Sequence, residues 1–179
     1  FYSLANELGV DTIHDQMEPL GFGRLTGIDL LGEVKGILPS TDWKKRAYKR
    51  PEQRRWYAGE TISLGIGQGY NTFTMLQVAS AMATLVSDGQ RFQPRVVREV
   101  EDVVTRERRV ISSQALSRVP YNPEHTAFIR EAMFGVTREG TGTRVFAGSD
   151  YLSGGKTGTA QAVTMRQNAT STPGDWASF

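Results

Sequence analysis

The stretch from residue 72 to residue 89 constrains the fold more than any other part of the chain. Its apolar residues recur at helical spacing and form one wide face, made of Met75, Leu76, Val78, Ala79, Met82, Ala83, Leu85 and Val86. Thr72 or Asn71 can cap this helix, and Asp88-Gly89 can close it. Because an apolar face is stable only when it is covered, we expect a helix that belongs to the core.

Two short helices and a long loop are expected before this helix. Residues 1–8 have helical spacing and stop at Gly9, a residue suited to the left-handed position after a helix end. Asp11 can cap a second helix, whose inward residues would be Ile13, Met17 and Leu20. From residue 24 to residue 55 the periodicity is lost and turn residues dominate, which predicts a long surface loop within a region of helices and loop spanning 1–94.

The second half of the chain mixes strand and helix patterns. Residues 95–112 alternate valines with charged residues, which predicts a hairpin, and residues 151–165 are typical of a strand. Between them, Asn122 can cap a helix over 122–138. Its buried face would hold Phe128, Ile129, Ala132, Met133 and Val136. The order of these elements predicts a mixed α/β chain of the α+β class.

A basic and aromatic segment inside the loop could bind an anionic polymer. The run from Trp43 to Arg50, followed by Arg54-Arg55-Trp56, interleaves cations with aromatic rings, as in proteins that bind nucleic acid or anionic glycan. The simpler alternative is a solvated loop whose aromatic residues pin it to the body of the protein. We favour this alternative because the charge is confined to one segment.

Composition excludes several kinds of function. Lys and Arg outnumber Asp and Glu by only 21 to 19, which is too small an excess for a general nucleic-acid surface. The chain has no cysteine, and neither His14 nor His125 has a partner at metal-ligand spacing, so we expect no metal or other cofactor. No run is long and apolar enough to span a bilayer, and the sequence opens and closes as if cut from a larger domain at both ends.

The segment from Ser153 to Thr159 contains the motif that carries chemistry. A phosphate-binding loop would need glycine at position 150, where the chain has Asp150, and a helix directly after Thr157. Lys156-Thr157-Gly158 instead fits the Lys-Thr-Gly strand of serine acyltransferases that recognise penicillin. In a strand, Thr157 and Thr159 would share one face, where two hydroxyls can hold a peptide carboxylate. Lys156 could then assist proton transfer, and the Thr159 N–H could form half of an oxyanion hole.

Several motifs together give the chain a resemblance to a known family. In order along the chain they are Thr26-Gly27-Ile28-Asp29-Leu30, Gly65-Ile66-Gly67-Gln68-Gly69, Gly140-Thr141-Gly142-Thr143 and Lys156-Thr157-Gly158-Thr159-Ala160-Gln161. This set resembles the class B penicillin-binding proteins and covers nearly the whole chain. The segments 38–44 and 56–61 are most similar to the elongation-specific penicillin-binding protein 2 of Gram-negative bacteria.

The resemblance implies a fold and a function. The fold would be that of penicillin-binding transpeptidases and serine β-lactamases, a central antiparallel sheet with helices, incomplete in this chain. The function would be that of a serine D,D-transpeptidase that cross-links peptidoglycan stem peptides at D-Ala-D-Ala and is acylated by β-lactams. A carboxypeptidase, a β-lactamase, a β-lactam sensor and a catalytically silent scaffold of the wall-synthesis complex remain alternatives.

The resemblance also implies the roles of individual residues and of partners. Lys156 and Thr159 would be catalytic, and Thr157, Gly158 and Thr159 would bind substrate. The nucleophilic serine, with its Ser-x-x-Lys motif, is expected outside this chain. Expected partners are the stem peptide, β-lactams, the remainder of the same transpeptidase domain and a membrane glycosyltransferase of the elongation complex, but no nucleic acid. The domain would lie in the periplasm, anchored to the inner membrane by a segment outside this chain.

Overall fold

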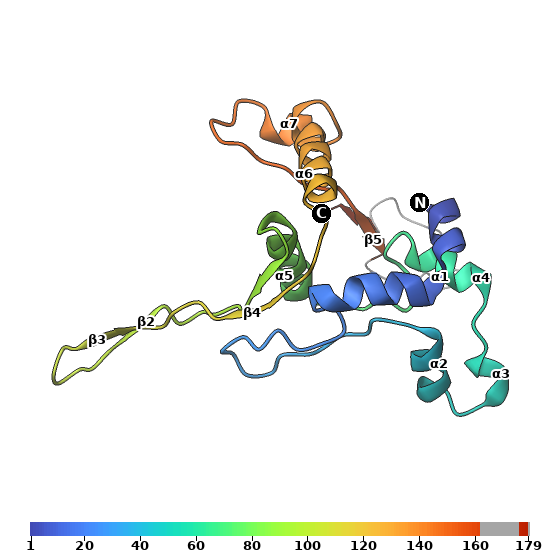
Figure 1. Cartoon of the computed structure of the whole chain (residues 1–179), viewed down its shortest axis with the longest axis horizontal. Helices are drawn as coiled ribbons and strands as arrows, with labels where there is room; N and C mark the ends of the chain where they lie inside the picture. The colour runs from blue at the N-terminus through green and yellow to red at the C-terminus, as the bar shows by residue number, and fades with distance from the viewer. Residues whose placement is uncertain (162–175, 179) are drawn as a thin grey trace. The chain divides into compact units, whose positions relative to one another are not determined.

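The computed structural model describes residues 1–161 and 176–178 (Figure 1). The chain divides into two compact units, Phe1–Tyr121 and Asn122–Phe179. Helices make up most of the regular structure, and each ladder among the described residues is antiparallel. This mixture confirms the predicted α+β class. No helix within these residues is long and apolar enough to cross a membrane.

The first unit opens with helix α1 (Tyr2–Met17) and the 3-10 helix η1 (Glu18–Leu20). Helix α1 is broken at Gly9, whose φ of 75° and ψ of 159° lie outside the helical region, as the predicted helix end requires. The predicted cap at Asp11 is wrong, because Asp11 lies inside the helix. Its two carboxylate oxygens accept hydrogen bonds from the N–H and the hydroxyl of Thr41, both at 2.8 Å.

Three short helices follow where the sequence predicted mostly loop. They are α2 (Thr41–Ala47), α3 (Pro51–Arg54) and α4 (Ala58–Leu64). The loop predicted for 24–55 is therefore wrong over its second half. Local signals start two of these helices: the Ser40 side chain accepts from the Trp43 N–H at 2.9 Å, and Pro51 occupies the first turn of α3.

Helix α5 (Met75–Val86) is the helix expected over 72–86, but it starts later. The Thr74 and Gln77 side chains form a capping box at its start. Neither Asn71 nor Thr72 is the cap, because Thr72 pairs with Ile37 in an isolated antiparallel bridge that keeps its backbone extended. A contact between residues far apart in sequence therefore fixes where α5 begins.

The apolar face of α5 lies outside the core of the first unit. The buried residues of the helix are Gln77, Ala81 and Thr84, whereas the Met75 side chain is 67% exposed and Met82 is 36% exposed. The prediction that this apolar face is buried is therefore wrong within the first unit. The Gln77 amide faces inward instead, and donates to the carbonyls of Arg24 at 2.6 Å and Lys35 at 2.7 Å.

The hydrophobic core of the first unit is small. Phe22, Leu38 and Ala81 are buried together, and Met17, Leu20 and Phe73 pack against them. The ring centroids of Phe22 and Phe73 lie 4.5 Å apart. Helix α5 thus contributes Ala81, and the segment from η1 to Leu38 supplies most of the remaining apolar surface.

Two ladders belong to the first unit. Strand β1 (Gln90–Phe92) pairs with β4 (Ala115–Arg118), and β2 (Glu99–Glu101) pairs with β3 (Arg108–Val110). The second pair confirms the hairpin predicted over 95–112. Figure 1 shows it projecting from the ends of β1 and β4.

The second unit is built on helix α6 (Pro123–Arg138). Its ends match the predicted 122–138, because the Asn122 side chain accepts from the Glu124 N–H at 2.9 Å and Pro123 starts the helix. The predicted buried face is wrong, since Phe128 is 74% exposed while Thr126 and Thr137 are buried. Helix α7 (Thr143–Phe146) follows, and β5 (Thr159–Gln161) pairs with β6 (Trp176–Ser178).

Candidate functional site

Helix α6 holds the segment that contains the predicted motif. The Thr137 hydroxyl donates to the Ser153 carbonyl at 2.6 Å, and the Gly155 N–H donates to the Met133 carbonyl at 3.1 Å. Both contacts lie on the C-terminal half of α6. A buried threonine, which the sequence did not single out, is therefore one of the residues that position the motif.

Gly154 allows this close approach. A Cβ atom at Gly154 would lie 3.2 Å from the Met133 carbonyl carbon and 3.3 Å from the Phe134 ring, which is tighter than ordinary packing permits. A larger residue would therefore push the segment away from the helix. Gly154 thus has a structural role in bringing the motif backbone against α6.

The strand predicted over 151–165 is observed only as β5, from Thr159 to Gln161. Residues 152–158 form no strand, so the prediction is wrong there; the segment makes backbone contacts with α6 instead. Residues 162–165 lie outside the described residues. Thr157 is followed by Gly158 and then by strand β5. The helix that a phosphate-binding loop requires after Thr157 is therefore absent from this position.

Lys156, Thr157 and Gly158 are exposed. The Lys156 ammonium donates to the Thr157 carbonyl at 2.6 Å, and the Thr157 hydroxyl lies 3.1 Å from the Thr141 hydroxyl. Thr159 starts β5, and its side chain is outside the description. The structure therefore brings Thr157 together with the Gly140-to-Thr143 turn, a contact that the motif order alone did not indicate.

Ser153 and Lys156 also have the spacing of a Ser-x-x-Lys motif, which the sequence prediction passed over. That motif needs a helical turn to bring residues i and i+3 together. Ser153-Gly154-Gly155-Lys156 is not helical here, and two glycines oppose helix formation. The spacing alone therefore does not make Ser153 a nucleophile.

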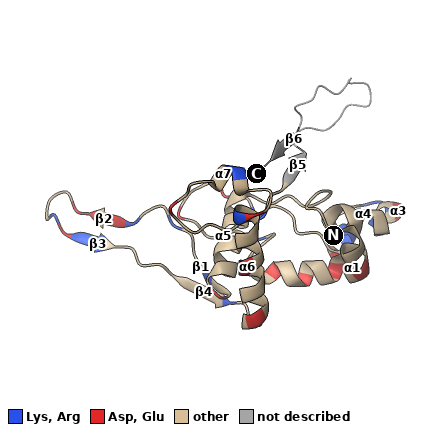
Figure 2. Ribbon diagram, turned by 90° about the horizontal axis from the view of Figure 1, so that it is seen from above, with Lys and Arg blue, Asp and Glu red and all other residues tan. Residues whose placement is uncertain are grey.

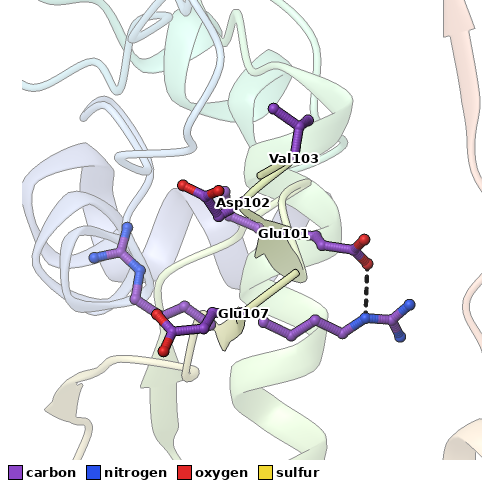
Figure 3. A pocket seen from close by; sticks show the side chains of 7 residues that line it. Glu101, Asp102, Val103 and Glu107 are labelled. Carbon is purple, nitrogen blue, oxygen red and sulfur yellow. Dashed lines mark hydrogen bonds and ion pairs between the residues drawn. The ribbon is translucent and has the colours of Figure 1, made fainter. Parts of the chain in front are cut away.

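The charged residues that line a pocket beside the β2–β3 hairpin form ion pairs and hydrogen bonds that stabilise the hairpin. Acidic β2 faces basic β3 in Figure 2, and the Glu101 carboxylate pairs with Arg106 at 3.0 Å and Arg108 at 2.8 Å. The Asp102 carboxylate (Figure 3) accepts from the Val104 and Thr105 N–H groups, both at 2.8 Å, and these bonds lower its pKa. The charges around this pocket are therefore explained by contacts within the hairpin.

The basic and aromatic segment is pinned to the body of the first unit, as the simpler alternative expected. Lys44 is 3% exposed and pairs with the Glu60 carboxylate in the first turn of α4. Its ammonium lies 5.4 Å from the ring centroids of Trp56, Tyr57 and Tyr70. One cation of the run is therefore buried inside an aromatic cage.

Glu60 links several members of this cage through its carboxylate. Its carboxylate also accepts from the Tyr57 N–H at 2.8 Å and the Tyr70 hydroxyl at 3.0 Å. Burial raises the pKa of Glu60, but the hydrogen bonds from Lys44, Tyr57 and Tyr70 outweigh burial, so the pKa lies below its usual value. The pKa of Tyr70 is raised by its hydrogen bond with Tyr48, by burial and by Glu60. Within the described residues, no group of three His, Cys, Asp or Glu side chains could hold a metal.

Comparison with known proteins identifies the family. The sequence model of the family described as the penicillin binding protein transpeptidase domain matches residues 1–179, the whole chain. The chain belongs to this family. The transpeptidase motif order found in the sequence is therefore more than a chance likeness, and the predicted family is confirmed.

Relatives of this transpeptidase-family chain include the peptidoglycan D,D-transpeptidase MrdA of Haemophilus influenzae, 35% identical over 94% of this chain and 25% of its own length. Among solved structures, Pseudomonas aeruginosa PBP2 in complex with WCK 5153 has a TM-score of 0.73 and 32% identity, covering 89% of this chain and 35% of that one. A structure on the coordination of polymerization and crosslinking by a peptidoglycan synthase complex has a TM-score of 0.69 and 30% identity, covering 85% and 23%. The chain thus spans about a quarter of the curated relative, and these folds confirm the predicted fold class.

Proposed function

We propose that this chain is part of a serine D,D-transpeptidase that cross-links peptidoglycan stem peptides at D-Ala-D-Ala and is acylated by β-lactams. The match of the family model to the whole chain is the observation that carries this proposal. The relative from Haemophilus influenzae, named a peptidoglycan D,D-transpeptidase, supports the same reaction.

In this reaction a serine outside the chain attacks the carbonyl between the last two D-alanines of a stem peptide. A bond forms between the serine oxygen and that carbonyl carbon, the peptide bond breaks, and the terminal D-alanine leaves with a proton on its amine. An amine of a second stem peptide then attacks the ester, and the serine regains its proton. No redox step or cofactor is needed.

The residues of this chain would bind substrate and assist the proton transfers. The exposed Thr157 hydroxyl is a donor for the terminal carboxylate of the stem peptide, together with Thr159. The Lys156 ammonium would raise the local positive potential beside the serine, favouring its ionised form. Gly158 leaves room for the substrate backbone, and the Thr159 N–H would stabilise the oxyanion, a contribution of about 3 kcal/mol.

We also propose that the remainder of the same transpeptidase domain covers the apolar faces of α5 and α6. Met75 is 67% exposed, Val78 is 40% exposed and Phe128 is 74% exposed. Apolar faces of this kind are normally covered. In the same proposal, a membrane glycosyltransferase of the elongation complex is a partner, by analogy with the related peptidoglycan synthase complex. The proposal also places the domain in the periplasm, on an inner-membrane anchor, because of the family resemblance.

Fluorescent-penicillin labelling of the full-length protein tests the function. We expect one covalent label on the wild-type protein, and labelling that falls at least tenfold in Lys156→Ala and clearly in Thr159→Val, because each removes a group that serves the acylation step. Absence of labelling in folded wild-type protein would contradict the transpeptidase and favour the silent scaffold.

A further inference from the structure

The hydroxyl of Thr157, a predicted substrate-binding residue, lies next to the hydroxyl of a second threonine, Thr141. The Thr141 and Thr157 Oγ1 atoms lie 3.1 Å apart, within hydrogen-bond distance. Both residues are exposed, so a ligand can reach the pair. Thr157 has a proposed role in binding substrate, whereas Thr141 has none so far.

The turn that carries Thr141 is fixed to the end of α6. The Gly140 N–H donates to the Gly135 carbonyl and the Gly142 N–H donates to the Val136 carbonyl, both at 2.9 Å. A Cβ atom at Gly140 would lie 2.9 Å from the Val136 Cα, so glycine is needed for this close approach. The backbone on both sides of Thr141 is therefore held by the helix.

The segment that carries Thr157 is fixed to the same helix through separate bonds. These are the Gly155 N–H to the Met133 carbonyl and the Thr137 hydroxyl to the Ser153 carbonyl. Because α6 holds both backbones, it fixes the positions of Thr141 and Thr157 relative to each other.

The two hydroxyls can act in series as hydrogen-bond donors. A hydroxyl has one proton to donate and can accept as well. If Thr141 donates to Thr157, the Thr157 proton remains available for a ligand, and a chain of donors runs from Thr141 through Thr157 to an anionic acceptor. Each bond in such a chain strengthens the next.

We propose that Thr141 is a positioning residue that directs the Thr157 hydroxyl proton toward the terminal carboxylate of the stem peptide, or toward the equivalent carboxylate of a β-lactam. This role rests on the proposed transpeptidase function. It extends the site beyond the Lys156-to-Thr159 motif, to a residue on the turn after α6.

The test uses the full-length protein and compares a penicillin with its methyl ester, which lacks the anionic carboxylate. Both compete with a fluorescent penicillin, and the competition yields the second-order acylation rate constant for each. Thr141→Val removes the hydroxyl and keeps the shape, while Thr141→Ser keeps the hydroxyl. Thr143→Val is the matched control, because the Thr143 hydroxyl bonds to the Gly140 carbonyl within the same turn at 2.8 Å.

We expect Thr141→Val to lower the rate constant for the acid about three- to tenfold, the effect of one hydrogen bond, and to leave that for the ester within about twofold. Thr141→Ser should restore the rate for the acid, and any loss in Thr143→Val should be equal for acid and ester. A Thr141→Val protein with unchanged rates, with equal losses for acid and ester, or with no rescue by serine, would overturn the positioning role alone. A wild-type protein that takes no label would overturn the proposed function and this role together.

Discussion

At the scale of single residues, the Lys44–Glu60 pair explains how a strongly basic segment is attached to the protein. The side chain of Lys44 is 4% exposed and that of Glu60 is 22% exposed, so both groups have lost much of their hydration. Removing one member of such a pair leaves the other buried without its counter-charge, which costs more than the pair itself contributes.

Glu60→Gln should therefore destabilise the protein by about 3 kcal/mol at pH 7. Since the pKa of Glu60 is lowered in the folded state, its contribution is present above the usual value of 4.5 and is lost as pH falls through the folded pKa. Denaturant unfolding at a series of pH values checks this: the gap between the wild type and Glu60→Gln should narrow below about pH 4.

Glu52→Gln is the control, because Glu52 is an exposed carboxylate on α3. It should change the free energy of unfolding by less than about 0.5 kcal/mol at any of these pH values. A gap for Glu60→Gln that stays constant from pH 7 to pH 3 would show that the carboxylate charge is not what stabilises the segment.

At the scale of elements, the sequence predicted helices best where local chemistry decides their ends. Both ends of α6 follow from Asn122, Pro123 and the glycines after Glu139. The start of α5 was missed because the bridge between Ile37 and Thr72 is a long-range contact. The apolar faces of α5 and α6 were recognised, but which face is buried depends on residues that no local pattern specifies, such as the carbonyls that Gln77 reaches.

The candidate site shows the same division at this scale. The Lys156-to-Thr159 motif and the Gly140-to-Thr143 turn could be found from their order in the sequence. Their meeting through Thr141 and Thr157, and the anchoring of Ser153 by Thr137, could not, because both need the path of the chain around α6.

Thr74→Ala should lower the free energy of unfolding by about 1 kcal/mol, because the Thr74 hydroxyl accepts the Gln77 N–H at the start of α5. Thr72→Ala is the matched control: this residue was a predicted cap, yet its side chain is exposed and only its backbone forms the bridge. Chemical denaturation of the two variants separates the alternatives. Equal losses, or a larger loss in Thr72→Ala, would count against the capping box.

At the scale of the whole molecule, the proposed substrate-binding residues of this chain are expected to act with a nucleophilic serine outside it. It spans about a quarter of the length of the Haemophilus influenzae relative. The isolated 179-residue chain should therefore form no covalent adduct when incubated with penicillin. Intact-mass spectrometry checks this; a stable mass increase of one penicillin would make Ser153, despite its non-helical setting, the first residue to examine.

Helix α6 bonds to the motif segment at Met133 and Thr137 and to the Gly140–Thr143 turn at Gly135 and Val136. Inserting one residue into this part of α6 would rotate the following residues by about 100° around the helix axis. The motif segment and the turn could then no longer both form their bonds to the helix. The stretch from Gly148 to Leu152 has no such restraint in its backbone bonding to α6, so it can absorb changes in length. Among homologous chains, insertions and deletions should therefore accumulate in that stretch and be absent from 133–142.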